Sequence, residues 1–116
     1  MEIKELLELQ KELDTKIIDK YNHANGLISD FGQGDFLTER LLALQVEVSE
    51  LANATRCFKY WSEKPAESKE RQLDEYADCL HFLLSIGHTL NFTAEEIEKA
   101  YLNKHKENYK RQKEGY

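Results

Sequence analysis

Apolar residues recur every three or four positions along long stretches of this chain, and residues that break helices are rare. The 116 residues include one proline and five glycines, and strong helix formers dominate between them. A spacing of three to four residues gathers apolar side chains on one face of a helix. The pattern therefore predicts an all-α fold.

Capping and breaking residues divide the chain into four expected helices, near residues 2–22, 36–61, 67–90 and from Thr93 onward. A loop is expected at 23–35, after an Asn-His-Ala-Asn-Gly cluster. Pro65 cannot continue the hydrogen bonds of the second helix. Thr93 and Glu96 form a capping box, with Phe92 and Ile97 as its hydrophobic staple. Short connections favour a four-to-five-helix antiparallel bundle in a single domain, 1–116.

Composition indicates a protein without membrane or nucleic-acid polymer partners. Hydrophobic residues make up 41% and charged residues 33% of the chain, which is typical of a soluble globular domain. No apolar run reaches 18 residues and the start is acidic, so a cytoplasmic location is expected. Cys57 and Cys79 lack the spacing of a redox or zinc motif and are interpreted as small buried residues.

The net charge of -6 is unevenly distributed. Residues 101–116 carry five basic and two acidic side chains, or +3, which leaves -9 for the remainder. An acidic protein is poorly suited to binding duplex DNA, because such binding neutralises many phosphates. A small polyanion is the better expected partner.

Two acidic pairs stand out, Glu47 with Glu50 and Glu75 with Asp78. Residues three apart share a helix face, so each pair forms an edge of two carboxylates. The first edge points the same way as an apolar stripe that includes Phe58 and Trp61, which predicts an enclosed site. Burying four carboxylates is costly unless cations compensate. Oxygen ligands select magnesium, manganese or calcium, so a divalent-cation site is predicted.

Three segments of the chain resemble the all-α nucleoside triphosphate pyrophosphatases, and specifically the dimeric dUTPase branch, which is related to MazG-type enzymes. They are LLALQVEVSELANATRCFKYWSEK (41–64), LDEYADCLHFLLSIG (73–87) and YLNKHKENYKRQKEGY (101–116). Between the two acidic pairs lie 24 residues, a spacing that suits this family. The combination of both pairs with the F-K-Y-W and K-x-x-x-N-x-x-R-Q-x-x-G-Y motifs carries the resemblance.

The resemblance implies a homodimer that hydrolyses dUTP, with dUDP as an additional candidate substrate, and that uses Mg²⁺ as cofactor, with Mn²⁺ as its substitute. Water would attack the α-phosphorus of dUTP and yield dUMP and pyrophosphate. All four carboxylates become metal ligands, and Glu50, with Glu47 as the alternative, would orient or deprotonate the water. On the same grounds phosphate binding falls to Lys104, Asn108 and Arg111, base binding to Gln10, Asp14 and Trp61, and further contacts to Lys59 and Tyr116.

Three other readings of the sequence stay open. A pyrophosphatase for dCTP or a modified nucleotide could use the same metal core. A di-iron bundle is suggested by Asp78 and His81, whose spacing such sites use, although no second acid-x-x-His pair occurs on the second helix. A helical interaction module without catalysis is the third reading. P-loop and serine-elbow motifs are absent from the sequence.

Overall fold

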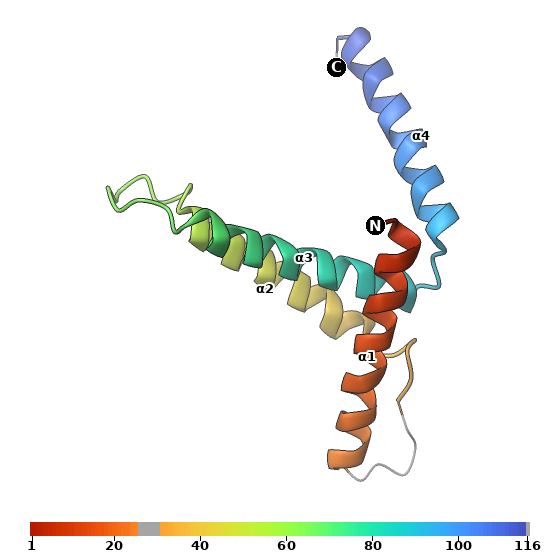
Figure 1. Ribbon diagram of the computed structural model, residues 1–116. Coiled ribbons are helices and arrows are strands. Elements are labelled where there is room, and N and C mark those ends of the chain that lie inside the picture. Colours follow the sequence, from red (N-terminus) through yellow and green to blue (C-terminus); the bar gives the residue numbers. More distant parts are fainter. Residues whose placement is uncertain (26–30, 116) are drawn as a thin grey trace.

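Helices account for most of the chain in the computed structural model, which describes residues 1–25 and 31–115 (Figure 1). They are α1 (Ile3–Asn25), α2 (Leu37–Thr55), α3 (Lys69–Thr89) and α4 (Ala94–Lys113). The described residues contain no strand, so the all-α prediction is confirmed. Part of the predicted loop, residues 26–30, lies outside the described residues. Within the described chain, no helix has the length and apolar character needed to span a membrane.

The second helix ends earlier than the sequence predicted, at Thr55 rather than near residue 61. Arg56 adopts a left-handed backbone conformation, with φ of 58°, and its N–H donates to the carbonyl of Ala52 at 2.9 Å. Its guanidinium also donates to Ser62 Oγ at 2.9 Å and to the carbonyl of Lys64 at 3.2 Å. These side-chain bonds hold the connection between α2 and α3 in place, and α2 ends ten residues before Pro65.

Side-chain caps define the starts of α3 and α4. Ser68 Oγ accepts from the backbone N–H of Arg71 at 3.2 Å, which caps α3. Thr93 Oγ1 accepts from the N–H of Glu96 at 3.1 Å, while the Glu96 carboxylate accepts from the N–H of Thr93 at 2.9 Å. The predicted capping box is therefore confirmed, and it satisfies backbone donors that would otherwise lack partners.

The helices form an antiparallel pair with two attachments rather than a closed bundle. In Figure 1, α2 and α3 run side by side, α1 crosses them near the end of α3, and α4 projects away from the pair. Among the described residues, the backbone of α4 lies close to α1 and not to α2 or α3, and only its first turn reaches α3, where Ile97 lies beside Gly87. The expectation that α3 and α4 are antiparallel neighbours is wrong, because the turn after Thr89 redirects the chain past α1.

A close helix crossing holds this arrangement together. A side chain at Gly87 of α3 would meet Leu7 of α1 and Ile97 of α4, each 3.7 Å from the position of its Cβ. Three helices therefore meet at Gly87, where a Cβ atom would make ordinary van der Waals contacts. Buried apolar side chains are few among the described residues: Leu7, Ile18, Ala54, Ile86 and Ala94.

Much of the apolar surface remains exposed in the single chain. The radius of gyration is 18.0 Å, whereas a compact domain of this length has one of about 13 Å. Large apolar side chains are exposed on every helix, among them Ile17, Leu42, Leu73, Leu83, Tyr101 and Leu102. A single chain of this length usually exposes fewer large apolar side chains in contiguous patches.

Candidate active site

Carboxylates from α2 and α3 come together midway along the helix pair. Glu47, Glu75 and Asp78 each offer one oxygen, and these three oxygens all lie within 4.8 Å of one another. Glu75 is buried, Glu47 half-buried and Asp78 exposed, so the cluster opens to solvent on one side. The structure thus brings together three of the four predicted metal ligands.

Glu50 lies at the edge of this cluster, one helical turn beyond Glu47. It is exposed and is not part of the three-residue group. The apolar stripe on the same side of α2 is also less covered than predicted, since Phe58 is 47% and Trp61 65% exposed. The sequence predicted that all four carboxylates are enclosed. Within a single chain that prediction is wrong for Glu50 and Asp78, which are exposed, and it holds only for Glu47 and Glu75.

The cluster has more negative charge than its surroundings compensate. Burial raises the pKa of Glu47, and the neighbouring carboxylates of Asp78, Glu75 and Glu50 raise it further. Arg71 donates to Glu75 at 2.9 Å, but the same guanidinium also pairs with Asp74 at 3.8 Å. Crowded carboxylate oxygens, with the pKa of Glu47 raised, fit a hard divalent cation, which would favour the ionised form of Glu47.

The raised pKa of Glu47 has a testable consequence for stability. In metal-free protein, protonation of Glu47 favours the folded state, so this contribution is lost as pH rises above the ordinary value near 4.5 through the folded-state pKa. Glu47→Gln should therefore raise the melting temperature at pH 7 and leave it nearly unchanged below the ordinary value. Thermal melts in a chelator across this pH range measure the difference. An equal effect at both ends of the range would contradict the crowding argument.

The two cysteines differ from their predicted burial. Cys57 is exposed in the turn after α2, so that prediction is wrong, and Cys79 is partly buried beside the acidic cluster. Burial raises the pKa of the Cys79 thiol, and the carboxylates of Glu47 and Asp78 raise it further. A protonated thiol is a poor metal ligand, which leaves oxygen as the ligand type of this cluster.

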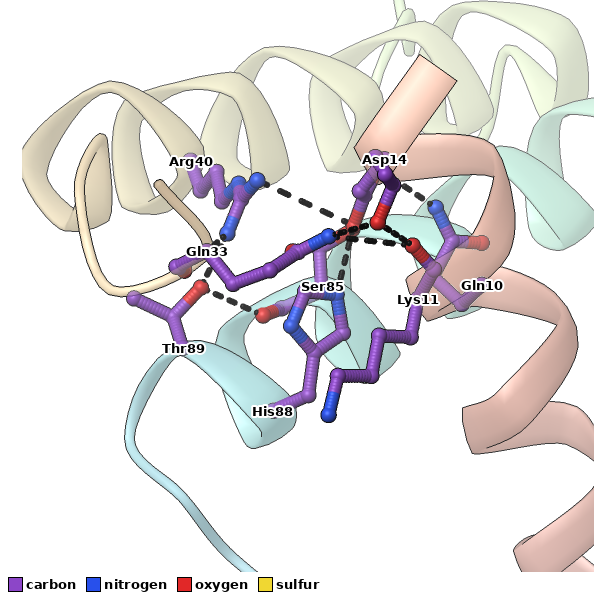
Figure 2. A network of polar contacts seen from close by, with 9 residues as sticks. Gln10, Lys11, Asp14, Gln33, Arg40, Ser85, His88 and Thr89 are labelled. Carbon is purple, nitrogen blue, oxygen red and sulfur yellow. Dashed lines mark hydrogen bonds and ion pairs between the residues drawn. The ribbon is translucent and has the colours of Figure 1, made fainter. Parts of the chain in front are cut away.

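A second polar cluster surrounds Asp14, where α1 crosses the other helices (Figure 2). Gln10 donates to Asp14 Oδ1 at 3.0 Å. Ser85 Oγ and His88 Nε2 of α3 donate to Oδ2 at 2.5 and 2.6 Å, and Arg40 of α2 lies 3.9 Å from the same oxygen. The structure thus places Gln10 and Asp14 in contact with each other and surrounds them with residues of α2 and α3.

Residues outside the predicted site complete this polar cluster. Arg40 donates to Thr89 Oγ1 and to the carbonyl of Gln33. Two buried atoms have no hydrogen-bond partner among the described residues, His88 Nδ1 and Gln33 Oε1. Ser85, His88 and Thr89 lie at the C-terminal end of α3, a helix with polar residues along much of its length, so the sequence carried no distinct signal for their contacts.

Asp14→Asn is expected to destabilise the protein by about 1–3 kcal/mol, because the amide group would face donors that now bind a carboxylate oxygen. Asp19→Asn is the matched control, since Asp19 is exposed on the same helix and should change stability little. Urea denaturation followed by circular dichroism measures both. Equal midpoints for the two variants would contradict a structural role for the Asp14 contacts.

The remaining aromatic and basic candidates of the α2–α3 connection lie far from Asp14. Trp61 contacts Phe58 and Tyr60 edge-on, with ring centroids 6.0 and 5.2 Å apart. Lys59 Nζ lies 5.7 Å from the centroid of the Phe58 ring. Arg40, which lies beside Asp14, and Arg56, which begins the connection that contains Trp61, stand at opposite ends of α2. They are about 24 Å apart along its axis. The structure therefore does not bring Trp61 together with Gln10 and Asp14 in one chain.

The predicted phosphate-binding residues share one side of α4 but stand apart from both clusters. Glu107 bridges two of them, since it lies 3.3 Å from Lys104 Nζ and 2.7 Å from an Arg111 guanidinium nitrogen. Asn108 is exposed on the same side. Among the described residues, the backbone of α4 does not lie close to that of α2 or α3. The three side chains are therefore distant from the carboxylate cluster of the same chain. Tyr116 lies outside the described residues.

An all-α chain that gathers carboxylates from an antiparallel helix pair defines a class, the all-α nucleoside triphosphate pyrophosphatases. The chain matches the family model described as dUTPase over two overlapping segments, residues 2–91 and 85–116, and it belongs to this family. It is also 29% identical to the dCTP pyrophosphatase of Enterobacteria phage T4 in an alignment of length 115. The alignment covers 84% of this chain and 67% of the relative. No solved structure matches the chain. The predicted family is confirmed.

Proposed function

We propose that this enzyme hydrolyses dUTP to dUMP and pyrophosphate with Mg²⁺ as cofactor. The observation that carries the proposal is the convergence of Glu47, Glu75 and Asp78, with three oxygens within 4.8 Å of one another, in a chain of the dUTPase family. Four carboxylates without a cation would repel one another, and a polyphosphate cannot approach them unless a cation bridges the two.

Each acidic residue has a proposed role in the reaction. Glu47, Glu75 and Asp78, joined by Glu50, would hold Mg²⁺, and Mn²⁺ could substitute. When bound, the metal supplies a lower pKa for water and offsets charge on the phosphate oxygens. Glu50 is exposed at the cluster edge, where its carboxylate can accept the proton of the attacking water. The water oxygen bonds to the α-phosphorus, the bond to the bridging oxygen breaks, and pyrophosphate leaves.

The polar cluster around Asp14 is the proposed end of the site that meets the base. Arg40 precedes Glu47 by seven residues on α2, and Ser85 follows Asp78 by seven on α3. Each interval corresponds to about 10 Å along the helix, a separation that an extended nucleotide can span. Gln10 is the side chain of this cluster proposed to contact the base, because an amide offers both a donor and an acceptor.

A related substrate, dCTP, is favoured by one observation. Asp14 accepts hydrogen bonds from Gln10 and Ser85 and lies 2.6 Å from His88 Nε2, and a carboxylate oxygen in such contacts acts as an acceptor. An acceptor suits the exocyclic amine of cytosine. The relative named dCTP pyrophosphatase supports the same alternative.

A homodimer is part of the proposal. The radius of gyration of 18.0 Å and the apolar side chains exposed on all four helices support it. A second copy can cover those faces in one symmetric contact, which is the commonest form of assembly. Trp61, distant from Gln10 within the chain, could then join the site of the other subunit.

A panel of dUTP, dUDP, dCTP, dTTP and UTP tests this function. Pyrophosphate release from the triphosphates, and orthophosphate release from dUDP, are measured with Mg²⁺, with Mn²⁺ and with excess chelator. We expect the highest kcat/KM for dUTP and no release in chelator. A preference for dCTP would replace the base assignment and keep the reaction. Release unaffected by chelator, or no release from any nucleotide, would overturn the proposed function, and the second result would favour a non-enzymatic module.

A further inference from the structure

We propose that the basic side of α4 acts on the other subunit. In this arrangement Lys104, Asn108 and Arg111 of one chain hold the phosphates of a nucleotide bound at the carboxylates of a second copy. The inference rests on the proposed function, because it assigns the source of the phosphate contacts in that same site.

The position of α4 keeps its basic residues away from the carboxylates of the same chain. From the corner between α3 and α4, Asp78 lies about 16 Å back along α3 and Lys104 about 15 Å forward along α4. The two helices diverge from this corner (Figure 1), and α1 is the only described helix whose backbone stays close to that of α4. The basic residues and the carboxylates of one chain are therefore held on separate arms.

An apolar groove lies where α3 and α4 diverge and α1 crosses them. It has a volume of about 550 Å³ and is lined almost entirely by apolar side chains of α1, α3 and α4, including Leu83, Ile97 and Ala100. On α4, Lys104, Asn108 and Arg111 follow Ala100 at intervals of four, four and three residues, so they continue the side that lines the groove. A helix seated in the groove would therefore run on past the basic residues.

Charge and exposed surface identify a second copy as the occupant. The segment 101–116 carries +3 and the rest of the chain -9, so the basic end of α4 is complementary to the body of another copy. The body also presents apolar side chains that match an apolar groove, such as Leu42 and Leu73, at 61% and 56% exposure. With Leu102 of α4 65% exposed, a symmetric contact would cover both partners at once.

Complementation between two inactive variants tests the inference. One variant carries Glu75→Gln with an intact α4, and the other carries Lys104→Ala and Arg111→Ala with intact carboxylates. After mixing and subunit exchange, about half of the dimers are mixed, and each mixed dimer has one intact site if α4 acts on the other subunit. We expect the mixture to regain about one quarter of the wild-type turnover. If α4 serves its own chain, no dimer regains an intact site.

Native mass spectrometry of differently tagged subunits verifies the exchange. Turnover no higher than that of the separate variants, with mixed dimers present, would overturn the inference, as would an active monomer in sedimentation. Those results leave wild-type hydrolysis intact, so they are distinct from failure of the proposed function.

A second measurement does not depend on activity. Wild-type dimers assembled from ¹⁴N- and ¹⁵N-labelled chains are treated with a carbodiimide, which joins lysines to carboxylates in contact. We expect cross-linked peptides from α4 and from the α2–α3 pair to combine both isotopes. Peptides of one isotope only, or none between these helices, would overturn the arrangement even if the wild-type protein hydrolysed no nucleotide.

Discussion

Glutamine in place of Glu75 is expected to lower the turnover of dUTP by roughly 100- to 1000-fold, the cost of removing one electrostatic contribution from a catalytic site. Glu75 is the buried member of the carboxylate cluster. Glutamine has the same shape, and its carbonyl can still accept the hydrogen bond that Arg71 donates. The substitution therefore removes charge from the cluster while the helix pair stays folded.

Glu70→Gln is the matched control, because Glu70 is exposed on the same helix and outside the cluster. Steady-state kinetics with Mg²⁺ and circular dichroism are measured for both variants. The control should retain the turnover and helicity of the wild type. A Glu75→Gln enzyme with near wild-type turnover would remove the carboxylate cluster from the site.

The second large effect is expected on α4. Replacing Lys104 and Arg111 together by alanine should lower kcat/KM for dUTP by roughly 100-fold, since each loses a hydrogen bond to a charged phosphate, and such bonds contribute about 1.5–3 kcal/mol before exposure weakens them. Both side chains are partly or largely exposed, at 42% for Arg111 and 69% for Lys104. Alanine retains the helix.

Lys106 and Lys110 provide a control with the same change in charge. They lie on the opposite side of α4 at helical spacing and are exposed. Alanine at both positions should change kcat/KM by no more than a few-fold, through the weaker overall field. Equal losses in the two double variants would show that charge alone, and not the side formed by Lys104 and Arg111, acts on the substrate.

Local signals in the sequence predicted the fold class and most helix boundaries. The capping box at Thr93 involves residues three apart, so spacing alone located the start of α4. The end of α2 was predicted too late because it depends on the left-handed conformation of Arg56. Few residues other than glycine and asparagine adopt that conformation, so the sequence carried no signal for it.

The site was predictable where its residues repeat along one helix. A spacing of three residues identified both acidic pairs. Gln10 and Asp14 are four residues apart, which also places two side chains on one face of a helix. The partners of Asp14 on α3 were missed, because Ser85 lies 71 residues away along the chain. Contacts of that kind depend on how α1 crosses α3, and helical periodicity contains no information about the crossing.

The positions of Trp61 and α4 follow from packing between elements rather than from periodicity. The resemblance of the third segment implies that Lys104 and Arg111 bind phosphate, yet the chain directs α4 away from its own carboxylates. A side chain that belongs to a site by motif but stands apart from it in the folded chain is what an assembly of two copies would produce.

Hydrolysis of dUTP in H₂¹⁸O with Mg²⁺, followed by ³¹P NMR, tests the central claim most directly. Attack of water at the α-phosphorus predicts two products, dUMP and pyrophosphate, with ¹⁸O in the phosphate of dUMP and none in pyrophosphate. Chelation of Mg²⁺ should stop the reaction. Release of dUDP and orthophosphate, or ¹⁸O in pyrophosphate, would contradict it.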